Sequence, residues 1–170
     1  MILLISTSCE KDESGNSKDV IVFKEINKTV VDTGIDSITG TCKDLRFELF
    51  LNDQSENLAM LTTNTGLINC DGFNSIMADT VSAKVLVLDE QMPISAEASW
   101  AGVHDLSLED FAGLGEKYIG YRSCFYPEGV NQYRFGWINI KLSSTKDTLT
   151  IISRADNQTI NKYIIAGKME

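Results

Sequence analysis

The sequence predicts an all-β protein, in the form of an antiparallel, jelly-roll-like β-sandwich with at most one short helix. Three observations support this class. After Asp19, apolar and polar residues alternate with a period of two in several segments, β-branched residues gather in short runs, and turn-forming residues separate these runs. Several short strands separated by turns are typical of a sandwich or a barrel. A chain of 170 residues has room for one such domain.

The first nine residues read as the end of an export signal. Met1–Ile5 is apolar, the small residues Ser6–Ser8 follow, and Cys9 comes next. This order resembles the lipobox of bacterial lipoproteins, in which small residues precede a cysteine that is acylated and becomes the new N-terminus. The apolar stretch is short, no basic region precedes it, and Ser6 stands where leucine is usual. We interpret residues 1–9 as a signal-peptide remnant ending at a lipidated Cys9; the alternative is a frayed N-terminus with a chance cysteine.

Residues 10–19 form an acidic segment without a single apolar side chain. Such a segment has nothing to bury, so we expect a flexible tether. Acidic residues directly after a lipidated cysteine resemble the surface-export signal of some Gram-negative lipoproteins. This resemblance implies export and an outer-membrane lipoprotein, with exposure on the cell surface as an open alternative.

Residues 20–170 are expected to form a single β domain. Its clearest strand is Asp44–Asn52, in which Leu45, Phe47, Leu49 and Leu51 share one face. A helical turn is expected at Ser107–Leu114, where the Ser107 hydroxyl can cap the first turn. The expected strands are Val20–Val31, Asp44–Asn52, Leu58–Ile68, Ser82–Leu88, Tyr118–Tyr126, Gln132–Leu142, Thr148–Ser153 and Lys162–Ala166.

Charge and composition argue against several functions. The formal net charge of -9 disfavours nucleic acid as a partner, because an acidic surface repels phosphates. His104 is the single histidine, so a multi-histidine metal site cannot form and we expect no cofactor. Asp105, Glu109 and Asp110 lie near His104, but an acidic start of the helical turn explains them as well as catalysis does. An enzyme is therefore the less favoured interpretation.

The two tryptophans have different settings. Trp137 lies inside a strand, where an indole is usually packed. Trp100 lies in the loop-like segment Ala96–Asp105 and is the better candidate for a ligand-binding residue, because an exposed indole can stack on a sugar ring.

The last third of the chain carries the most specific pattern. It combines Phe135-Gly136-Trp137, the Ile-rich run Leu149–Asn157 and the pair Ala166-Gly167, after a strand that reads Tyr118-Ile119-Gly120-Tyr121-Arg122. These motifs resemble uncharacterised exported bacterial β-sandwich proteins with a C-terminal Tyr/Phe-Gly-Trp strand motif. The resemblance covers Tyr118–Gly167 most clearly and 36–95 more faintly. It implies export and a β fold, and it implies no catalytic activity.

In the proteins that this chain resembles, the segment before a strand often reads as a calcium loop. Here Asp36 and Asp44 stand at the ends of the corresponding segment, while Ile38 and Gly40 at the intermediate positions offer no side-chain oxygen. Calcium takes six to eight oxygens, so we interpret the segment as a degenerate loop and expect no metal.

These observations predict a lipoprotein of the outer membrane or cell surface, with a binding or structural role. The membrane is reached through the N-terminal lipid, and the ligand of the domain is an unidentified glycan or protein. The alternative is a carbohydrate-binding module or a glycan-degrading enzyme. A sugar-binding module should expose an aromatic platform, and an enzyme should place two carboxyl groups face to face in a cleft.

The lipobox interpretation predicts that Cys9 is acylated. Mass spectrometry of protein purified from native membranes should find a diacyl or triacyl group on Cys9, and no residue before it. An unmodified N-terminus upstream of Cys9 in membrane-purified protein would show that the interpretation is wrong.

We also predict a disulfide between Cys42 and Cys70, with Cys124 free. If Leu51 pairs with Leu58 in a hairpin, Cys42 comes opposite Leu67, three residues from Cys70, and an oxidising compartment permits the bond. The alternative is three reduced, separately buried thiols. Peptide mapping without reductant should recover a Cys42–Cys70 peptide; a peptide that links either residue to Cys124 would refute the pairing.

Overall fold

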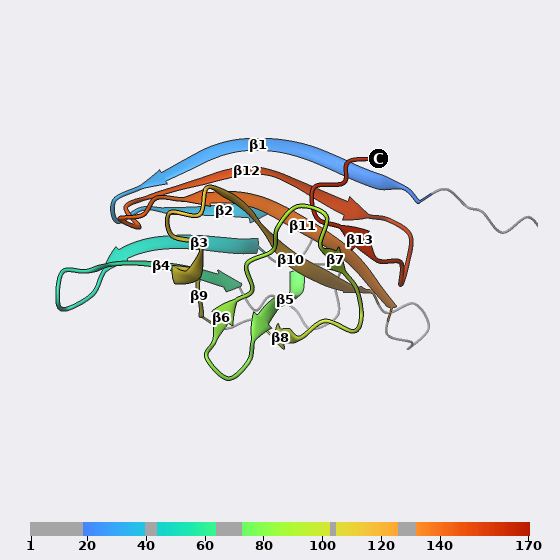
Figure 1. Ribbon diagram of the computed structural model, residues 1–170, viewed down its shortest axis with the longest axis horizontal. Coiled ribbons are helices and arrows are strands. Elements are labelled where there is room, and N and C mark those ends of the chain that lie inside the picture. Colours follow the sequence, from blue (N-terminus) through green and yellow to red (C-terminus); the bar gives the residue numbers. More distant parts are fainter. Residues whose placement is uncertain (1–18, 40–43, 64–72, 103–104, 126–131) are drawn as a thin grey trace, which may run out of the picture.

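The computed structural model describes residues 19–39, 44–63, 73–102, 105–125 and 132–170 (Figure 1). Within these ranges the protein has thirteen β-strands, one 3-10 turn and no α-helix, so the predicted all-β class is confirmed. The elements are β1 (Ile21–Val31), β2 (Ile35–Thr39), β3 (Asp44–Leu51), β4 (Asn57–Thr63), β5 (Phe73–Asp79), β6 (Lys84–Val85), β7 (Pro93–Ile94), β8 (Trp100–Gly102), β9 (Leu106–Ser107), the 3-10 turn η1 (Glu109–Phe111), β10 (Glu116–Phe125), β11 (Gln132–Leu142), β12 (Thr148–Asn157) and β13 (Ile164–Ile165).

Eleven of these strands belong to one sheet that curls back on itself. Its order is β1-β12-β11-β10-β5-β6-β9-β4-β3-β2, with β8 attached to β5, and a separate two-stranded sheet pairs β13 with β7. The two ends of the order, β1 and β2, are consecutive in sequence and contact each other, so the sheet is nearly closed. The architecture is therefore barrel-like rather than clearly two stacked sheets.

The first strand pairs with nearly the last one. β1 lies antiparallel to β12, from Ile21 opposite Asn157 to Val31 opposite Thr148. Figure 1 shows β1, β12 and β11 running alongside one another over the length of the molecule. This pairing brings the beginning and the end of the domain together.

The curved sheet buries side chains on both of its faces. The inner face holds the larger core, built from β3, β4, β5, β10, β11 and β12, with Phe47, Tyr121 and Ile138 among its fully buried members. A second core lies on the outer face of β10, β11 and β12, where the β7–β13 pair and the chain around it cover Phe135 and Trp137. Apolar side chains therefore cover the central strands on both faces of the sheet.

Two glycines allow this double burial. Gly120 of β10 is opposite Trp137 of β11, and Tyr121 of β10 is opposite Gly136 of β11. A Cβ atom at Gly136 would meet the Tyr121 ring and would come within 2.6 Å of the Ala155 carbonyl oxygen. A Cβ atom at Gly120 would lie 3.0 Å from Cγ of Met77. The absence of a side chain at these two positions therefore permits the close approach of the neighbouring rings and strands.

Trp137 is packed, as expected. Its side chain is 2% exposed, its Nε1 donates a hydrogen bond to the Lys168 carbonyl oxygen at 3.2 Å, and the Tyr118 ring meets it edge-on at 5.3 Å. The backbone carbonyl of the C-terminal segment therefore satisfies the one polar group of the indole.

The hairpin of β3 and β4 has a different register from the expected one. Leu51 pairs with Asn57 rather than with Leu58, and Leu49 pairs with Ala59. The Asn52 side-chain oxygen accepts hydrogen bonds from the backbone N–H groups of Gln54 and Glu56, which fixes a five-residue turn. A slip of one residue would turn Leu61 away from the core, so the observed register is the one that buries it.

Two further expectations are corrected. The segment Ala96–Asp105 is not simply a loop, because Trp100–Gly102 forms β8 and pairs with β5. The expected helical turn is a short 3-10 turn that begins after Leu108, without a side-chain cap at that residue. Ser107 still contributes, since its hydroxyl accepts a hydrogen bond from the Glu109 N–H at 3.2 Å.

Truncation of Trp137 should destabilise the domain strongly. Replacing a buried tryptophan by alanine leaves a cavity, and we expect Trp137→Ala to lower the free energy of unfolding by roughly 3–5 kcal/mol. Urea denaturation measures this. Tyr163→Ala is the control, because Tyr163 is 56% exposed and should change stability by less than about 0.5 kcal/mol. Equal stability of both variants would contradict the packing role.

Candidate functional site

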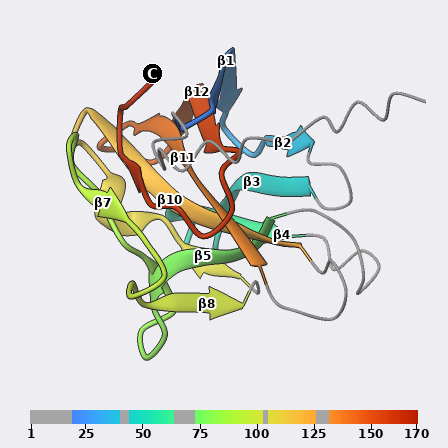
Figure 2. The same ribbon diagram turned by 90° about the vertical axis from the view of Figure 1, so that its right-hand side faces the viewer.

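Trp100, the ligand-binding candidate from the sequence, sits at the rim of the outer core. The residue begins β8, which lies beside β5 at the edge of the sheet (Figure 2). Its side chain is half-buried, its Nε1 donates to the Ser95 carbonyl oxygen at 3.2 Å, and its ring lies 5.9 Å from that of Phe135. These contacts fix the orientation of the indole while part of it stays open to solvent.

The neighbour of Trp100 is a cation. The Arg122 guanidinium carbon lies 4.8 Å from the centre of the Trp100 ring and 4.5 Å from that of the Tyr133 ring. Cation–π contacts of this kind contribute about 0.5–2 kcal/mol, depending on how far water is excluded. The Arg122 Nε atom is buried and has no hydrogen-bond partner in the part of the chain that the structure describes.

Small residues lie beside this arginine on the same face of the sheet. Arg122 is opposite Ser75 of β5, and Ser75 is opposite Gly102 of β8. Among the described residues, nothing would lie within 4 Å of a Cβ atom at Gly102, so these residues leave the space above this glycine open. We call the group Ser75, Trp100, Gly102, Arg122 and Tyr133 the arginine shelf. It combines the planar Arg122 cation, two aromatic rings and the small residues Ser75 and Gly102 between them. This combination suits noncovalent binding of a small polar group.

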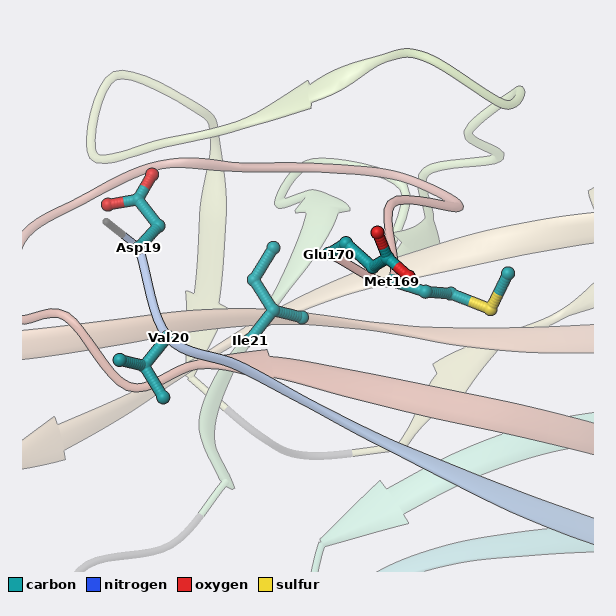
Figure 3. Close-up of a pocket in the computed structure, with 5 residues that line it drawn as sticks. All are labelled: Asp19, Val20, Ile21, Met169 and Glu170. Carbon is teal, nitrogen blue, oxygen red and sulfur yellow. The ribbon is translucent and has the colours of Figure 1, made fainter.

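The structure also has an open cavity of about 320 Å³ near both ends of the described chain. Asp19, Val20, Ile21, Met169 and Glu170 line it (Figure 3). Lys162 Nζ lies 3.9 Å from a carboxylate oxygen of Asp19. None of the residues that the sequence suggested for ligand binding lies here, and its carboxylates come from two flanking segments rather than from the paired strands.

The two acidic residues at the ends of the predicted calcium-loop remnant lie in paired strands, while residues 40–43 between them lie outside the described residues. Asp36 lies in β2 opposite Phe47, and Asp44 begins β3 opposite Thr39, so the two residues are about 10 Å apart along the ladder. Lys28 Nζ binds the Asp36 carboxylate at 2.8 Å. Burial raises the pKa of Asp36, but the hydrogen bonds from Lys28 and Ser37 and the lysine charge outweigh it, so the pKa is lowered.

The two acidic residues of the 3-10 turn form ion pairs with lysines. Lys84 Nζ lies 2.8 Å from a carboxylate oxygen of Asp110, and Lys146 Nζ lies 3.5 Å from one of Glu109. The hydrogen bond with Asp110 is the main cause of the raised pKa of Lys84. Asp105 is exposed. Across the described ranges, no group of three or more acidic, cysteine or histidine side chains is placed to hold a metal ion.

Several residues for which the sequence predicted a role lie outside the part of the chain that the structure describes. They are Cys9, Cys42, Cys70, Gly40 and His104. The backbone of Cys124 lies in β10 opposite Tyr133. Lipidation of Cys9 and the Cys42–Cys70 disulfide therefore stay predictions.

The sequence suggested Trp100 but not its partners. Arg122 and Tyr133 come from two other strands, and a local pattern does not reveal which strands become neighbours. One signal was present, since Arg122 stands between Tyr121 and Ser123 with no acidic residue within five positions on either side. Such a cation in a half-buried strand needs a partner, and aromatic rings supply it here.

In comparisons of sequence and structure, no family model, no curated protein and no solved structure matches this chain. Among the described residues, no helix has the length and apolar character required to span a bilayer.

Proposed function

We propose that this protein is an exported lipoprotein whose β domain is a binding module, held at the outer membrane or cell surface by a lipid on Cys9. The leader pattern before Cys9 and the acidic segment 10–19 support this location. We also propose that the fold is a jelly-roll-like β-sandwich. The support for this is that two separate apolar cores lie on opposite faces of the central strands.

The arginine shelf is the proposed binding surface. The observation that carries this is the placement of Arg122 between Trp100 and Tyr133, beside the open space above Gly102. Holding a cation and two rings in fixed positions at the surface reduces the conformational entropy lost when a ligand binds. A purely structural role would need neither the open floor nor a partly exposed indole.

A carbohydrate is the ligand class that Trp100 favours, because an indole beside hydrogen-bonding groups suits a pyranose ring. Catalysis on a glycan is less favoured. It would need two facing carboxyl groups, and Glu109 and Asp110, which the sequence suggested, each bind a lysine. The module therefore binds without cleaving in this proposal.

A glycan array probed with the full chain tests this function. We expect binding to at least one glycan, and Trp100→Ala should weaken it by about tenfold, equivalent to about 1.4 kcal/mol. Phe50→Ala is the control, because Phe50 is 37% exposed on β3, away from the shelf.

Thermal melting of both variants separates loss of binding from loss of fold. Binding that survives Trp100→Ala in a folded protein would contradict the assignment of the shelf. Absence of binding to any glycan would contradict the carbohydrate interpretation.

A further inference from the structure

We propose that the arginine shelf recognises an acidic glycan, with Arg122 binding a carboxylate or sulfate group of the sugar. This inference rests on the proposed function and specifies the chemistry of its ligand. It follows from three features of Arg122: the two aromatic rings that contact its guanidinium, the absence of an ion pair with any described residue, and the small residues beside it.

The rings of Trp100 and Tyr133 decide which donors of Arg122 a ligand can reach. Both rings contact the guanidinium, at 4.8 and 4.5 Å from its central carbon, and Nε is buried. The donors of Arg122 that remain for a ligand are its terminal nitrogens, at the edge of the guanidinium. An arginine edge presents two parallel N–H donors, which match the two oxygens of a carboxylate or sulfate.

Arg122 also differs from Arg46 and Arg154, each of which has an acidic partner. Arg46 lies 2.7 Å from Glu48, and Arg154 lies 3.9 Å from Asp156. Across the described ranges Arg122 has no ion pair, although the chain carries a formal net charge of -9. A half-buried cation without an anion is costly, and an oxyanion from a ligand would complete the site.

The floor of the shelf suits a sugar ring. Ser75, which is buried at 8% exposure, lies opposite Arg122, and the described residues leave open space above Gly102 one strand further on. The Trp100 indole borders this space on the same face of the sheet. A pyranose ring over Gly102 and Ser75 would place an acidic substituent at the Arg122 edge, and its apolar face could contact the indole.

Calorimetry with matched charged and neutral glycans tests the inference. The probes are oligogalacturonate and its methyl ester, which differ in charge on the same backbone, and dextran sulfate and dextran. We expect the full chain to prefer a charged probe over its neutral counterpart at least tenfold, with binding that weakens as NaCl is raised. Preference for oligogalacturonate would assign a carboxylate, and preference for dextran sulfate would assign a sulfate.

Substitutions identify the residue responsible. Arg122→Gln should weaken binding of the charged probe at least tenfold and so remove the preference for it over the neutral probe, whereas Arg122→Lys should retain part of the preference, because lysine keeps the charge but lacks the planar edge. Arg46→Gln is the matched control, since it removes the same charge from β3, and it should change nothing. If Arg122→Gln does not fold, the Arg122 Nε–H resonance of the native protein should shift on titration with oligogalacturonate.

The possible failures are distinguishable. Equal binding of charged and neutral probes, unaffected by Arg122→Gln, would overturn the acidic-glycan inference and leave the proposed function standing. No binding of any glycan would overturn both. Equally tight binding of poly-glutamate would show that the anion need not be carried by a sugar, which also overturns the inference.

Discussion

The constraint on which the structure depends is the reciprocal pairing of glycine and aromatic residues across β10 and β11. Tyr121 packs over Gly136 on the inner face, and Trp137 lies opposite Gly120 on the outer face. A side chain at either glycine would occupy the space that a ring or its neighbours fill. The two strands are therefore covered on both faces by large rings at adjacent positions, and this packing adds to the backbone hydrogen bonds in favouring the observed register.

The inner half of this arrangement ends in a buried polar contact. The Tyr121 hydroxyl donates to the Asp156 carboxylate of β12 and lies 3.3 Å from the Ala155 carbonyl oxygen. Burial raises the pKa of Tyr121 well above its ordinary value, and the charge of Asp156 adds to this effect, so the phenol stays a donor. Because Arg122 follows Tyr121 in β10, its side chain lies on the opposite face of the sheet, where it belongs to the arginine shelf.

The sequence predicted some elements closely and missed others for physical reasons. The expected strand Gln132–Leu142 matches β11, because Ile138, Ile140 and Leu142 alternate with residues of the other face. By contrast, β5 has no alternation, since its described side chains from Ser75 to Ala78 are all buried. Because the consecutive apolar residues Ile76, Met77 and Ala78 pack on both faces, this strand lacks the period of two on which the prediction depends. The arginine shelf could not be predicted for another reason. Arg122 contacts Trp100 only because β10, β5 and β8 are neighbouring strands, and the sequence does not reveal that order.

The pairing of β1 with β12 has a consequence for the order in which the chain acquires its structure. Ile21 cannot pair with Asn157 until the ribosome has synthesised almost the entire domain. Closing a loop of this length is slow, and a topology dominated by distant contacts folds late. During synthesis the amino-terminal strand remains without its neighbour. A polypeptide with this topology completes its sheet only after β12 has left the ribosome, so its amino-terminal strand stays without its β12 partner through most of synthesis.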